Sequence, residues 1–220
     1  MENLVFNLGG IFKWIVKGGP LVVPIVICSI FALAIIIERL LFYHHIRFDR
    51  SELLSKIFDL VKKNRITEAI EVCEKKPLYL TNILKAGLLK YDQSKEVIRE
   101  AMEDASLYEI PKLEKNLNFL NTISHISPLL GLLGTVVGLV ICFYTIEQKA
   151  INVGVVNPSD LARGIYQALI TTVLGLCVAI PGYIAYHYFV HKVDIYILEA
   201  ERAATELLEI LSLRRYQIEV

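Results

Sequence analysis

Four of the polar side chains inside long apolar stretches of the sequence are candidates for a functional role, because a polar group there is costly unless it is paired or functional. They are Thr135 in one stretch, and Gln167, Thr171 and Thr172 in the next. On a helix, Gln167 and Thr171 share a face, and Thr172 lies about 100° further round. Hydroxyl and amide groups in such surroundings either hydrogen-bond neighbouring helices or line a path for an ion. Taken alone, these residues favour hydrogen bonding between helices.

Glycines accompany the polar residues at helical spacing. Gly134 and Gly138 form a GxxxG pair, with Gly131 on the adjoining turn, and Gly175 lies in the next apolar stretch. Small residues let helix backbones approach closely, and helices in lipid associate through such contacts. We therefore predict that these four glycines pack helix against helix.

Other reactive residue types do not form a recognisable site. The sequence has no nucleotide-binding loop, nucleophile elbow or metalloprotease helix, and its four cysteines lack the spacing of metal ligands. His187 and His191 are spaced like metal ligands, but they stand beside Lys192 at the end of an apolar stretch, where aromatic rings commonly lie at the interface. Glu38 is better explained by an ion pair with Arg39 than as a proton-relay acid. We predict no metal, no cofactor and no enzymatic activity.

Composition indicates a membrane protein. The 220 residues are 55% hydrophobic, with a mean hydropathy of +0.50. The 23 Lys and Arg residues balance 23 Asp and Glu residues, which argues against a nucleic-acid partner. Three stretches carry no formal charge: 21–37, 116–146 and 164–191. Because about 20 helical residues cross a bilayer core, each is long enough to span, and the first is too long to be a cleavable signal.

The predicted fold is an all-α integral membrane protein. Its transmembrane helices cover 20–43, 118–146 and 164–190, with Pro24, Pro128 and Pro181 as local kinks or junctions. The remaining segments are an interfacial helix at 1–19, a loop at 147–163, and long helical extensions at 44–117 and 191–220.

Within the first extension, apolar spacing predicts helices over 51–63, 66–76 and 81–92. From Lys95 we expect one long helix that runs into the second span, with Pro111 as its only breaker.

The charges of the connecting segments predict an orientation. The segment 44–117 is rich in Lys and Arg near its start, whereas the loop at 147–163 holds only Lys149 and Arg163. The positive-inside rule therefore places both extensions in the cytoplasm, and the N-terminus and the loop outside.

Two motifs carry a family resemblance. PLLGLLGTVVGL at 128–139 is followed, after a short loop, by GIYQALITTVLGLCVAIP at 164–181. Together they resemble the proton-channel family that contains ExbB, TolQ and the flagellar stator protein MotA. IERLLFY at 37–43 is similar as well, whereas the first extension matches only in length and helical character. The three predicted spans fit the ExbB and TolQ branch better than the four usual in MotA.

The resemblance implies a homopentamer in the bacterial inner membrane, around a single-span, dimeric partner like ExbD or TolR. The threonines at the positions of Thr135 and Thr172 line the pore in this family, so we expect the ion pathway to be formed by Thr135, Thr172, Gln167 and Thr171. Protons or sodium ions would drive a TonB-like protein for transport across the outer membrane, or a TolA-like protein for outer-membrane maintenance.

Gln167 departs from the family pattern. ExbB and TolQ commonly have a glutamate at this position, whereas an amide cannot release a proton near neutral pH. The second and third spans contain no carboxylate. The resemblance implies that the titrating acid is an aspartate of the partner. A non-conducting scaffold for a single-span partner is the alternative of another class.

Overall fold

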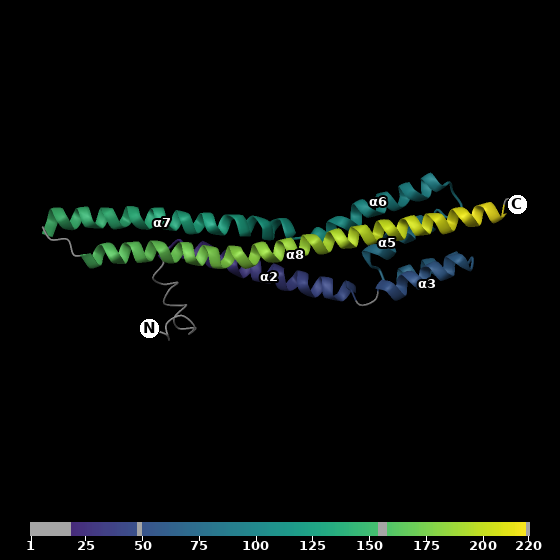
Figure 1. Cartoon of the computed structure of the whole chain (residues 1–220), viewed down its shortest axis with the longest axis horizontal. Coiled ribbons are helices and arrows are strands. Elements are labelled where there is room, and N and C mark those ends of the chain that lie inside the picture. The colour runs from purple at the N-terminus through teal and green to yellow at the C-terminus, as the bar shows by residue number, and fades with distance from the viewer. Residues whose placement is uncertain (1–18, 48–49, 154–157, 219–220) are drawn as a thin grey trace. The chain divides into compact units, whose positions relative to one another are not determined.

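A computed structural model describes residues 19–47, 50–153 and 158–218 of the chain. All secondary structure in these ranges is helical (Figure 1). The helices are α2 (Val22–Arg47), α3 (Arg50–Lys62), α4 (Ile66–Lys75), α5 (Tyr79–Leu88), α6 (Lys95–Glu114), α7 (Leu117–Val153) and α8 (Pro158–Ile218). The interfacial helix predicted over 1–19 falls outside the described residues, except for Gly19.

The chain divides into two units, and the long helices α2 and α8 contribute to both. Among the described residues, the first, here the span unit, comprises 19–37, 116–153 and 158–187. The second, here the extension unit, comprises 38–47, 50–115 and 188–218.

The three predicted membrane spans are present as helices. Among the described residues, the apolar parts of α2, α7 and α8 are long enough, by length and composition, to cross a membrane. Within the span unit, α7 and the first half of α8 run side by side in opposite directions (Figure 1). Pro128 and Pro181 lie inside these two helices.

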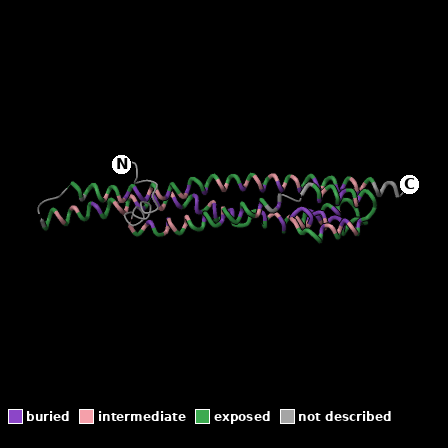
Figure 2. Tube along the Cα trace, turned by 90° about the horizontal axis from the view of Figure 1, so that it is seen from below, coloured by how far each residue is buried: buried purple, intermediate pink, exposed green. Residues whose placement is uncertain are grey.

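Large apolar side chains on all three helices remain exposed in the single chain. Along the helices, exposed positions alternate with half-buried and buried ones (Figure 2). Examples are Ile30, Val140 and Ile184. Such side chains would be unfavourable in water, so the surface of the span unit suits lipid or neighbouring apolar helices.

The extension unit has an apolar core of its own. The three helices predicted within 44–117 are present as α3, α4 and α5, and their apolar faces supply this core. Its most buried members include Ile57, Val61, Leu84, Leu88 and Leu207. Cys73 is also buried, and this burial raises the pKa of its thiol to about 11. Such a thiol acts as a small apolar group rather than as a nucleophile.

The prediction of one continuous helix from Lys95 into the second span is wrong. α6 ends at Glu114 and α7 begins at Leu117. Asn116 between them has φ 63°, a left-handed conformation that interrupts the helical hydrogen-bond ladder. Pro111, the expected breaker, lies inside α6.

Two side chains of α2 cap the end of α6. Arg39 Nη1 donates to the carbonyls of Lys112 at 3.4 Å and of Leu113 at 3.3 Å, and the Tyr43 hydroxyl donates to the Leu113 carbonyl at 2.8 Å. The last carbonyls of a helix lack partners within the helix, and a cation there also complements the helix dipole. Arg39 also forms the predicted ion pair with Glu38, at 2.9 Å.

Leu88 and Leu89 allow a matched test of the core. Leu88 is 0% exposed, whereas its neighbour Leu89 is 56% exposed. We expect Leu88→Ala to destabilise the extension unit by about 2–5 kcal/mol through lost burial and a residual cavity. We expect Leu89→Ala to change stability by less than about 0.5 kcal/mol. Thermal unfolding of the detergent-purified protein, followed by circular dichroism, measures both, and equal effects would contradict the described core.

Candidate functional site

A seam of small residues joins α7 to α8 within one chain. A methyl group added at Gly138 would lie 3.0 Å from the Cβ of Ala168. One added at Gly131 would lie 3.0 Å from the Cα of Thr172, and one at Gly175 would lie 2.6 Å from the carbonyl oxygen of Ser127. At 2.6 Å the backbones would have to shift, and at 3.0 Å the neighbouring atoms would have to give by a few tenths of an ångström. The glycines therefore permit this close approach.

The seam extends beyond the residues singled out from the sequence. A methyl group on Gly182 would lie 2.6 Å from the hydroxyl of Ser124, and one on Gly164 would meet the sulfur of Cys142. Ser127, also unanticipated, is fully buried. The sequence signal for the α8 side is a run of small residues at helical spacing: Gly164, Ala168, Gly175 and Gly182.

Thr171 lies inside this seam. Its side chain is 1% exposed and packs against Gly134, where a methyl group would overlap it. Its hydroxyl is 2.6 Å from the carbonyl of Ala168 and 3.4 Å from that of Gly131. Thr171 therefore faces α7 of its own chain and does not reach the surface of the span unit.

Thr172 and Thr135 lie at the edge of the seam, and both are half-buried. The Thr172 hydroxyl donates across the seam to the Gly131 carbonyl at 3.1 Å. In an α-helix that carbonyl also accepts from the N–H of Thr135, so the two threonines meet at one peptide group. The Thr135 hydroxyl donates to the Leu132 carbonyl at 2.6 Å.

This arrangement leaves the two threonine oxygens able to accept. A hydroxyl has one hydrogen and two lone pairs, and the hydrogens of Thr135 and Thr172 are used within the chain. Their oxygens can accept a hydrogen bond from a protonated carboxyl group or water, or can contact a cation. Neither hydroxyl releases a proton near neutral pH, so the pair can contact an ion or a protonated group but cannot itself titrate.

Gln167 lies apart from the threonine pair. It is half-buried, and its Nε2 atom lies against the backbone of Gly19, the residue with φ 77° that precedes α2. A side chain at Gly19 would be strained by this φ and would overlap the amide. Gln167 therefore packs where the chain enters α2.

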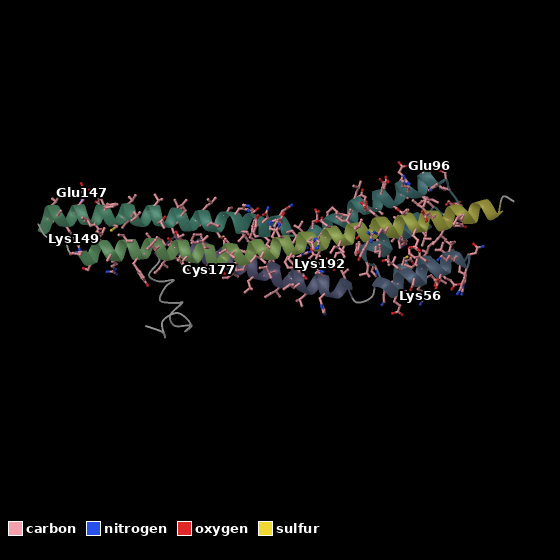
Figure 3. All side chains as sticks on the ribbon, in the orientation of Figure 1. Lys56, Glu96, Glu147, Lys149, Cys177 and Lys192 are labelled. Carbon is pink, nitrogen blue, oxygen red and sulfur yellow. The ribbon has the colours of Figure 1, made fainter. Side chains whose placement is uncertain are left out.

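The helices flanking the threonine pair contain no acid at membrane depth. Residues 116–146 and 164–187 include neither Asp nor Glu. Glu147 follows near the C-terminal end of α7, close in sequence to Lys149 (Figure 3).

Histidine and tyrosine rings occupy the opposite end of the span unit. The ring of His125 lies 5.8 Å from that of Tyr183, which lies 4.4 Å from that of His187, and Nδ1 of His125 bonds the Asn121 carbonyl at 2.9 Å. No cluster of three or more potential metal ligands occurs among the described residues.

The seam predicts a position-specific sensitivity to one methyl group. Gly175→Ala places a methyl against the backbone of Ser127 and Gly131, which cannot rotate away, so we expect a loss of roughly 1–3 kcal/mol in stability. Cys177→Ala, at an exposed position on α8, is the control and should have little effect. Thermal unfolding midpoints in detergent measure the difference, and a Gly175→Ala protein as stable as its parent would rule out this close contact.

Comparison with known proteins identifies the family. Residues 75–202, more than half of the chain, match the model of the MotA/TolQ/ExbB proton channel family. A putative biopolymer transport protein ExbB-like 3 from Synechocystis is 32% identical over 163 residues, covering 74% of this chain and 77% of its own. Biopolymer transport protein ExbB from Aquifex aeolicus is 41% identical over 90 residues, covering 41% of this chain and 58% of its own. Tol-Pal system protein TolQ from Pseudomonas aeruginosa is 40% identical over 101 residues, covering 44% of this chain and 41% of its own. The chain thus belongs to the MotA/TolQ/ExbB proton channel family, in the branch that contains ExbB and TolQ.

Proposed function

We propose that this chain is the channel-forming subunit of an ion-driven motor of the ExbB type. The observation that carries the proposal is the pair of half-buried hydroxyls, Thr135 and Thr172, held at one peptide group of a helix pair that has no acid of its own. Family membership supports it, because the threonines at these positions are those expected to line the pore.

We assign fewer residues to the ion pathway than the sequence suggested. Thr135 and Thr172 face it, and Gln167 stands near its outer end. Thr171 is assigned to the seam, because its hydroxyl is buried and bonded within the chain. Its role is to fix the register in which Thr172 reaches the Gly131 carbonyl.

The titrating group must then be supplied by a partner. An ionised acid in the middle of a bilayer costs about 2.5–3.5 kcal/mol on insertion scales, and it lowers that cost by facing a polar surface. A protonated carboxyl on a single-span, ExbD-like partner avoids that cost, and it would meet acceptor oxygens at the two threonines. Protonated, it would donate to a threonine oxygen, whereas ionised it would repel the same lone pairs. Its preferred position would therefore change with each proton bound or released.

The assembly proposed for this function is a homopentamer around the transmembrane helices of a dimeric partner. The large apolar side chains exposed on α2, α7 and α8 suit contacts with lipid and with neighbouring copies. The charge asymmetry of the loops supports an inner-membrane orientation with both extensions in the cytoplasm.

The energy source would be the ion gradient. A proton moving through the potential releases about 2.3 kcal/mol per 100 mV, enough to change the partner's preferred position by more than tenfold at each step. A TonB-like protein would pass this work to transport across the outer membrane. A TolQ-like role in outer-membrane maintenance, through a TolA-like protein, uses the same site.

Gln167 and the absence of a carboxylate in the second and third spans motivate a second candidate of another class. In that alternative the chain is a scaffold that stabilises its single-span partner and conducts no ions. Proton flux distinguishes the two: liposomes holding the purified complex acidify under a potential if it conducts, and remain unchanged if it is a scaffold.

The threonine pair provides the decisive variant. We expect Thr135→Val with Thr172→Val to leave the oligomer intact, because valine has the shape of threonine, but to lower proton flux at least tenfold, because no hydroxyl remains for the carboxyl. The control is Thr122→Val with Thr145→Val, two exposed residues of α7 whose hydroxyls bond their own helix at 2.9 and 2.8 Å. Liposome flux and native mass spectrometry give both readouts. Undiminished flux in the Thr135 and Thr172 variant would refute the assigned pathway.

A further inference from the structure

A positively charged pocket lies in the extension unit, apart from the threonine pair. It is open, with a volume of about 970 Å³, and is formed by α2, the α4–α5 turn and the end of α6. Its walls carry five cationic side chains: Arg39, Lys75, Lys76, Lys112 and Lys115. The acidic side chains in the walls are Glu38 and Glu109.

Both of these acids are already neutralised inside the pocket. Glu38 Oε1 lies 2.9 Å from Arg39 Nη2. Glu109 Oε1 lies 2.6 Å from Lys112 Nζ and accepts from Asn82 Nδ2 at 3.0 Å. Five cationic side chains against two acidic ones give the pocket walls a formal excess of three positive charges, although Lys75 and Lys76 also interact with other groups.

One acid outside the pocket walls pairs with Lys75. The carboxylate of Glu71 lies 3.9 Å from Lys75, and both side chains are exposed. Exposed pairs at such distances are largely screened by water and salt. The pocket is therefore an electropositive surface in a chain whose overall charge is zero.

Arg39 adds a second and independent indication of a ligand. Its side chain is 2% exposed, and Nη1 and Nη2 are held by the α6 carbonyls and by Glu38. Nε is buried and has no acceptor among the described residues. A buried donor without an acceptor is unfavourable, and an anionic oxygen entering between Arg39 and the lysines would relieve it.

We propose that this pocket binds a phosphate group. Several lysines lining one pocket beside a fixed guanidinium suit the distributed charge of a phosphate better than that of a single carboxylate. The pocket also has apolar walls, which include Phe42 and Ile46 of α2. Arg39 stands two residues beyond the apolar run that ends at Ile37, where a membrane-spanning helix meets the headgroups.

One phosphate chemistry has two sources at this position. It can belong to an anionic phospholipid, whose acyl chains would follow the exposed Leu41 of α2, or to a soluble phosphate compound. The site uses no residue of the proposed ion pathway, so its occupancy can be tested without measuring ion flux.

The test compares two short-chain lipids and a free anion. The full chain is purified in a neutral detergent and titrated with dihexanoyl phosphatidylglycerol, dihexanoyl phosphatidylcholine or inorganic phosphate, while its thermal unfolding midpoint is recorded. A higher unfolding midpoint with phosphatidylglycerol but not with inorganic phosphate assigns a lipid headgroup. A higher midpoint with inorganic phosphate assigns a soluble phosphate. The proposal is overturned if neither phosphatidylglycerol nor inorganic phosphate raises the midpoint, or if phosphatidylcholine raises it equally.

Variants locate the binding. Lys76→Gln with Lys115→Gln removes two exposed cations from the walls and should weaken the response at least tenfold in apparent affinity. Lys76→Arg with Lys115→Arg should retain it. The matched control is Lys90→Gln with Lys95→Gln, exposed lysines outside the pocket, which should respond like the parent. An unchanged affinity in the first variant, or an equal loss in the control, overturns the assignment of the pocket.

Discussion

The contact between the α7 and α8 backbones is the constraint on which the candidate site depends. Helices in lipid gain little from the hydrophobic effect against each other, so close packing must hold them together. Here Gly131 and Gly175 let the two backbones meet, and the seam buries Thr171. Because Thr171 is fixed on this side, Thr172 one residue later must emerge at the edge of the seam. Thr135 lies there too, one turn beyond Gly131. The glycines therefore determine which hydroxyls can meet an ion or a partner.

A second polar contact shapes the extension unit. The guanidinium of Arg39 and the hydroxyl of Tyr43 donate hydrogen bonds to carbonyls in the last turn of α6. Just beyond it, Asn116 interrupts the helical hydrogen bonding. Capping by side chains of another helix ties α2 to α6 without burying a charge that lacks partners. The same arrangement draws Arg39 into the wall of the cationic pocket. The cap of α6 and one wall of the pocket thus share Arg39.

Much of the fold could be predicted from periodicity, but the positions of individual side chains could not. Amphipathic spacing located α3, α4 and α5, and the uncharged stretches located the apolar spans. The break at Asn116 was missed because one left-handed residue leaves no periodic trace, whereas Pro111 was a visible and misleading signal. Spacing also placed Gln167 and Thr171 on one face. It could not say that Thr171 would pack against Gly134 while Gln167 reached Gly19. The pocket could not be predicted from the sequence, because its lysines come from segments far apart along the chain.

The absence of an acid from the second and third spans is consistent with a division of labour between two chains. A carboxyl fixed in the wall would be a constant charge for any partner to overcome, and it would compete with the partner's own acid for the same proton. In the proposed pathway, an amide at Gln167 adds no titrating group to the wall. A neutral wall of hydroxyls discriminates only between the protonated and ionised forms of whatever faces it. Movement can then follow the protonation of one mobile group, and the wall need not change its own charge during the cycle.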